Sequence, residues 1–97
     1  MATFIGLFKF TEQGVRNVKA SPERAEAFRA IVKKAGGKVR DTFWTMGHHD
    51  GVLIFDAPDD ESATRIMLSL AAKGNVKTET LRAFDAKEFS AVVKDLG

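Results

Sequence analysis

The chain has 97 residues, no cysteine, 44% hydrophobic and 29% charged residues, and a formal net charge of +2 at pH 7. Its length predicts one domain over residues 1–97, small enough to gain stability from a partner. The composition excludes disulfides, thiolate chemistry and cysteine-based metal sites, and no apolar stretch approaches the roughly 20 residues of a membrane span. No secretory leader is recognisable, so a cytoplasmic location is expected.

Charge is distributed unevenly along the chain. Residues 9–40 hold nine Lys and Arg against three acids, whereas residues 41–63 hold six acids and no basic residue. A basic half is a feature of nucleic-acid-binding proteins. However, lysines near a helix C-terminus also complement the helix dipole, and no aromatic residue lies among them to stack on bases. Nucleic-acid binding is therefore not predicted.

The first predicted strand, residues 3–10, is apolar on both faces, and the strand predicted over residues 51–57 repeats this pattern. Successive side chains of a strand point to opposite sides of the sheet. An antiparallel sheet with helices on one side normally has a polar outer face, so a second subunit is expected to cover the other side. The opposed residues are Phe4, Phe8 and Phe10 against Ile5 and Leu7, and Leu53 and Phe55 against Val52 and Ile54.

Between these strands the sequence predicts a helix and a further strand. Thr11-Glu12-Gln13-Gly14 indicates a turn or helical start, and Ser21 is the expected N-cap of a helix with Pro22 at its first position. Gly36-Gly37 ends this helix through a left-handed C-cap. The strand over residues 38–46 then turns at residues 47–51 into its neighbour, which predicts a hairpin.

The second half repeats the pattern. Asp59 and its acidic neighbours open a helix that ends at Gly74-Asn75, and residues 76–84 form a less apolar strand. Asp85 caps a last helix with Glu88 three residues later. The apolar residues Phe89, Val92, Val93 and Leu96 are expected to dock that helix on the domain.

The order β-α-β-β-α-β with a C-terminal helix predicts an α+β fold of the ferredoxin-like class, with a four-stranded antiparallel sheet and both crossover helices on one face. Four stretches, residues 10–17, 45–50, 57–61 and 74–84, together resemble the GYD domain family. The resemblance implies a dimeric α/β barrel, in which two such subunits pack sheet on sheet. The family's tyrosine before the aspartate is replaced by His49, while Asp50 is kept.

His48-His49-Asp50 is the strongest chemical signal, because imidazole and carboxylate groups are usual metal ligands. Adjacent residues of a hairpin point to opposite sides, so a polar hairpin tip is the preferred interpretation, and no metal site is predicted. A metal site and a His–Asp acid/base pair stay as alternatives.

A ligand-binding site is predicted from Trp44, His49, Asp50 and Arg82, the aromatic, titratable and guanidinium groups expected at the sheet. A guanidinium in an apolar space suits a carboxylate or enolate, although Arg82 could instead pair with Glu79 or with an acid of the partner subunit. For Trp44, Phe43 and Met46, packing in the core is the preferred interpretation and pocket lining is the alternative.

The function favoured by these features is a small homodimer, formed by sheet packing, that holds a small organic ligand between or beside its sheets. The alternative is a cofactor-free monooxygenase or isomerase with an apolar pocket, known among dimeric α/β barrels. Haem or metal binding is a weaker alternative. Neither catalytic residues nor a cofactor are predicted, and fold analogy cannot choose among these functions.

Overall fold

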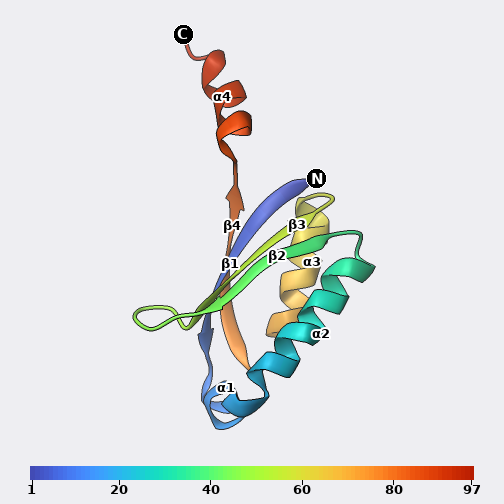
Figure 1. Cartoon of the computed structure of the whole chain (residues 1–97), viewed down its shortest axis with the longest axis vertical. Helices are drawn as coiled ribbons and strands as arrows, with labels where there is room; N and C mark the ends of the chain where they lie inside the picture. The colour runs from blue at the N-terminus through green and yellow to red at the C-terminus, as the bar shows by residue number, and fades with distance from the viewer.

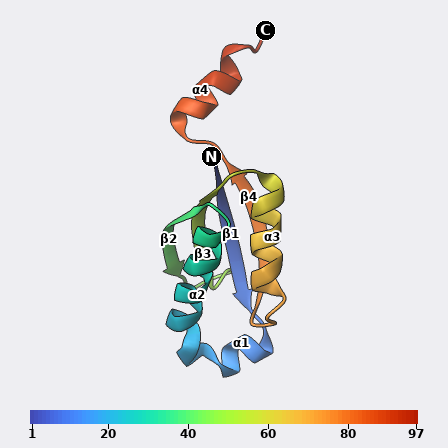
Figure 2. The ribbon, with the colours of Figure 1, turned by 90° about the vertical axis from the view of Figure 1, so that its right-hand side faces the viewer.

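The computed structural model describes all 97 residues and has the β-α-β-β-α-β order with a C-terminal helix. The four strands form one antiparallel sheet in the order β2-β3-β1-β4, and α2 and α3 lie together on one of its faces (Figures 1 and 2). The α+β ferredoxin-like class is therefore confirmed. The elements are β1 (Ala2–Phe10), α1 (Glu12–Arg16), the 3-10 helix η1 (Val18–Ala20), α2 (Ser21–Lys34), β2 (Lys38–Trp44), β3 (Gly51–Ala57), α3 (Asp60–Ala71), β4 (Val76–Ala83) and α4 (Ala86–Lys94).

The core lies between the sheet and the helices α2 and α3. Phe55 of β3 is fully buried, stacks on Phe4 at 5.7 Å between ring centroids, and meets the edge of Phe28 from α2 at 5.8 Å. Such aromatic pairs contribute about 0.5–1.5 kcal/mol beyond their burial. They fix α2 over the centre of the sheet.

The opposite face of the sheet is apolar in its centre, as the alternation predicts. Ile5 of β1 pairs with Ile54 of β3 on one side and with Leu81 of β4 on the other, and Leu7 pairs with Val52. No helix of the chain covers this open face, whose apolar side chains are partly exposed (Figure 1).

Helix caps follow the sequence at three places and differ at one. Thr11, Asp59 and Asp85 each accept a hydrogen bond from a backbone N–H of the first turn of α1, α3 and α4. The prediction that Ser21 caps α2 is wrong. The 3-10 turn η1 leads directly into α2, so Ser21 is already helical and Ala20 occupies the cap position.

The docking predicted for the last helix is also wrong within this chain. β4 runs into α4, which extends beyond the end of the sheet (Figures 1 and 2). The apolar side chains of α4 and of the residue pair that follows it are 39–74% exposed, and they are Phe89, Val92 and Val93 in the helix and Leu96 after it. Asp85 and Glu88 make a reciprocal capping box at the start of this helix, which satisfies backbone N–H groups of its first turn locally.

Candidate functional site

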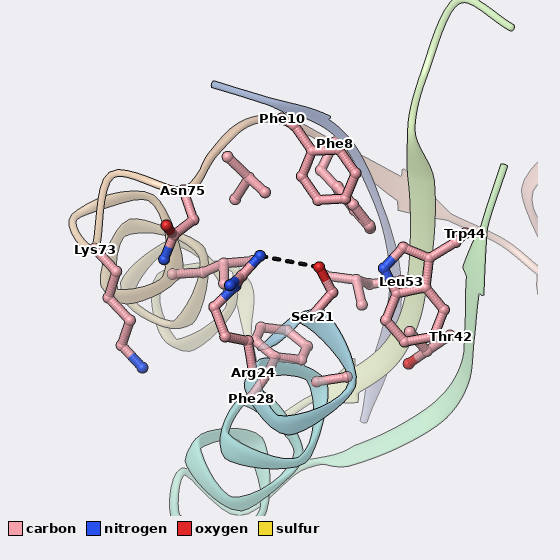
Figure 3. A pocket seen from close by; sticks show the side chains of 13 residues that line it. Phe8, Phe10, Ser21, Arg24, Phe28, Thr42, Trp44, Leu53, Lys73 and Asn75 are labelled. Carbon is pink, nitrogen blue, oxygen red and sulfur yellow. Dashed lines mark hydrogen bonds between the residues drawn. The ribbon is translucent and has the colours of Figure 1, made fainter. Parts of the chain in front are cut away.

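Trp44 lies on the helix side of the sheet because β2 contains a bulge. The register shifts between Val39 and Asp41, so Trp44 shares a face with the buried Val39, and Phe43 turns to the open face. The indole lines a small cavity beside α2, together with Thr42 and Leu53 (Figure 3). Trp44 is nevertheless 46% exposed, so part of its side chain lines the cavity and part of it is in contact with solvent.

The β2–β3 loop carries the two histidines over the end of β1. The carboxylate of Asp50 accepts a hydrogen bond of 2.8 Å from the backbone N–H of Phe10, which ties the loop to that strand. His49 Nε2 lies 4.0 Å from Glu79, on the open-face side of β4. His48 Nε2 lies 3.3 Å from the ammonium of Lys9. The two imidazoles meet edge to face at 4.9 Å, and no group of three or more metal-ligating His, Asp or Glu side chains gathers here.

One hypothesis paired Arg82 with Glu79, and the structure does not bring these two side chains together. Glu79 lies on the open face, whereas Arg82 is opposite Phe4 on the helix side. The guanidinium lies 5.6 Å from the ring centroid of Phe4 and 4.5 Å from that of Phe84. It also lies 3.5 Å from the carboxylate of Glu88, so Arg82 joins β4 to α4.

The four residues of the predicted ligand site are therefore not gathered around one cavity of the single chain. Trp44 and Arg82 lie on the helix side, and His49 turns toward the open face. Asp50 is used as a backbone anchor for β1. A shared site in a dimer stays a prediction.

A polar cluster lies on the open face, and no motif in the sequence pointed to it. Asp56 of β3 accepts hydrogen bonds from the Thr3 hydroxyl at 2.7 Å and from Arg40 Nε at 2.9 Å. Burial raises the pKa of Asp56, but these two hydrogen bonds and the Arg40 charge outweigh it and hold the pKa below its usual value. The same hydrogen bond raises the pKa of Arg40. The pairing depends on the β2 bulge, because Arg40 is the extra residue there.

Two apolar surfaces thus remain uncovered by the chain itself. One is the centre of the open face, and the other is the stripe on α4. Contiguous apolar surface of this kind marks interaction sites in soluble domains. None of the helices has the length and apolar character needed to cross a membrane.

Two comparisons with known proteins gave a match for this chain. The family model of the GYD domain matches residues 4–93. A protein of Thermus thermophilus, named "Glutamine synthetase and cystathionine beta-lyase binding protein", is 34% identical over 95 residues, which is 97% of this chain and 100% of the relative. The match to the family model over nearly the whole chain shows that this protein belongs to the GYD domain family.

Proposed function

We propose that this chain is a homodimeric protein-binding domain whose partners are metabolic enzymes. The observation that carries the proposal is the exposed apolar stripe of α4, which extends from the domain where another protein can reach it (Figure 2). The relative from Thermus thermophilus is named for binding glutamine synthetase and cystathionine β-lyase. We extend these two partners to this chain and place it with them in the cytoplasm.

The α4 stripe has the form of a helix that inserts into a groove. Phe89, Val92 and Val93 recur at the i, i+3, i+4 spacing by which amphipathic helices bind a hydrophobic groove, and Leu96 follows just after the end of the helix. Phe89 is 54% exposed and offers the largest apolar side chain of the four. Aromatic side chains of this kind are frequent hot spots of binding energy.

The open face is assigned to a second copy of the chain. Its apolar centre is formed by paired residues of β1, β3 and β4, and an identical sheet can cover it about a two-fold axis. Light scattering should then give about twice 10.6 kDa. Ile54→Asp should give the monomer mass, whereas Val15→Asp, at an exposed apolar position of α1, should leave the dimer intact. A wild-type monomer at micromolar concentration would contradict the assignment.

Binding to the enzymes is tested by biolayer interferometry. This chain is immobilised, and glutamine synthetase and cystathionine β-lyase, purified from the organism that encodes this chain, are added in solution. Phe89→Asp should raise Kd by roughly 25-fold, the loss of about 2 kcal/mol that a hot spot contributes. The matched control is Leu68→Asp, which makes the same change at a 65% exposed position of α3. Failure of both enzymes to bind, or equal losses in the two variants, would refute the proposal.

A small organic ligand enclosed between two sheets is the second candidate. It is favoured by the pair His49 and Glu79, which places polar groups 4.0 Å apart beside the apolar Leu7 and Leu81. Native mass spectrometry of the dimer would report a retained molecule as a defined extra mass. A dimer of protein mass alone, purified without dialysis, would count against this function.

A further inference from the structure

A cavity of about 50 Å³ lies on the helix side of the sheet (Figure 3), and no residue of α4 lines it. It is formed where the first turns of α2 face the end of α3 and the start of β4. Its floor is apolar and consists of Phe8, Phe28 and Leu53. A volume of this size holds about three to four water-sized groups, which is the size of a carboxylate with one attached carbon.

All charged residues that line the cavity are positively charged. Arg24 and Lys73 contribute cationic side chains, and no Asp or Glu lines the cavity. Neither cation forms an ion pair with an acid elsewhere in the chain. An anion entering the cavity would therefore meet unneutralised positive charge above an apolar floor.

Arg24 is held in place rather than free to move in solvent. Its two terminal nitrogens donate to the carbonyl oxygen of Asn17 at 2.8 Å and to the hydroxyl of Ser21 at 2.9 Å. Ser21 is itself only 7% exposed, so it fixes the guanidinium from beneath. A guanidinium has five N–H donors, and these two hydrogen bonds leave donors for a ligand. Pre-organisation of this kind lowers the entropy lost on binding.

Trp44 completes the site on its other side. Its indole faces Ser21 and Arg24 across the cavity (Figure 3), and its N–H makes no hydrogen bond within the chain. The exposed part of the ring offers a flat apolar surface at the mouth. We propose that this cavity binds a small organic acid, with its carboxylate on Arg24 and its apolar group against Trp44. The inference is independent of the enzyme partners and of the dimer.

The test uses phenylacetate as the probe, because its carboxylate and methylene match the cavity volume and its ring can lie on the indole. The chain has one Trp and no Tyr, so fluorescence excited at the indole band reports on this site alone. Titration at constant ionic strength should give a saturable change in emission. The uncharged analogue phenylacetamide should give none.

Arg24→Gln should weaken phenylacetate binding at least ten-fold, the loss expected from removing a charge-assisted hydrogen bond. Arg29→Gln is the matched control, since Arg29 lies on the same helix outside the cavity, with its side chain 51% exposed. Trp44→Leu, followed by calorimetry, gives a second measurement and should also bind more weakly. A non-saturable response, equal binding of the amide, or equal effects of the two arginine variants would each overturn the proposal.

Discussion

The polar cluster around Asp56 gives the most specific stability prediction. The change is Asp56→Ala, which removes the acceptor of the hydrogen bonds from Thr3 and Arg40. A hydrogen bond to a charged group contributes about 1.5–3 kcal/mol. The Arg40 side chain is 55% exposed, so solvent screens its pair with Asp56 and the hydrogen bond from Thr3 carries most of the contribution. The variant no longer buries a charged carboxylate, and this gain offsets part of the lost hydrogen-bond energy. The free energy of unfolding is therefore expected to fall by a net amount of about 2 kcal/mol.

This loss should depend on pH in a direction fixed by the pKa. Because the folded-state pKa of Asp56 lies below its unfolded value, the carboxylate contributes stability that is fully present above the unfolded pKa of about 3.9. That contribution disappears as pH falls through the lowered folded-state pKa. The difference between wild type and Asp56→Ala should thus be constant near neutral pH and shrink below about pH 4.

Thermal unfolding at one fixed protomer concentration measures the effect, since association also shifts Tm. A loss of about 2 kcal/mol corresponds to roughly 10 °C in a domain of this size. Asp41→Ala is the control, because Asp41 lies on the same sheet face and takes part in no ion pair or side-chain hydrogen bond. Equal Tm values for wild type and Asp56→Ala at pH 7, or a difference that persists unchanged at pH 3, would refute this account of Asp56.

Three further predictions concern packing, metal and capping. A Cβ at Gly51 would overlap the ring of Phe8 and lie 2.7 Å from the carbonyl oxygen of Phe43. In denaturant titration, Gly51→Ala should therefore lower the free energy of unfolding by about 1–3 kcal/mol, and adding Phe8→Leu to that variant should recover part of the loss. Chelator should leave Tm unchanged; a drop reversed by zinc and absent in His48→Ala would instead establish a metal site at the hairpin. Asp85→Ala removes the cap of α4 and should reduce helicity by circular dichroism, at a cost of about 1 kcal/mol to that helix.

The fold could be predicted because local signals agreed with one another. Asp59 and Asp85 cap the helices that they were expected to start, and the turns at Gly36 and Gly74 have the positive φ that glycine permits. The alternation in β1 and β3 also assigned both faces correctly, because those strands pair without interruption. Where strands pair without a bulge, the alternation of successive side chains is sufficient to assign each residue to one face of the sheet.

Of the residues that line the cavity beside α2, Trp44 alone was among those predicted for a ligand site, and β2 shows why its placement could not be predicted. Strict alternation puts Val39 and Phe43 on one face, but the bulge at Arg40 moves Trp44 there instead. One extra residue in a strand is invisible to a pattern of hydrophobicity, yet it decides which aromatic side chain lines a cavity. Arg24 was missed for a related reason, since a cation on a helix looks solvent-facing until the turn before it is known to bring Asn17 within reach.

Whether α4 stays helical before a partner binds is the last prediction. The helix has nine residues, fewer than the roughly 12–15 that a helix needs to persist alone in water, and its capping box stabilises it by only about 1 kcal/mol. Its backbone amides should therefore exchange rapidly in the free protein and become protected when a partner enzyme covers the apolar stripe, while those of β1 and β3 stay protected throughout. Hydrogen exchange with and without glutamine synthetase measures this directly. If α4 is already protected in the free protein, and loses that protection on dilution to monomer, a second copy covers the stripe and the enzyme must bind elsewhere.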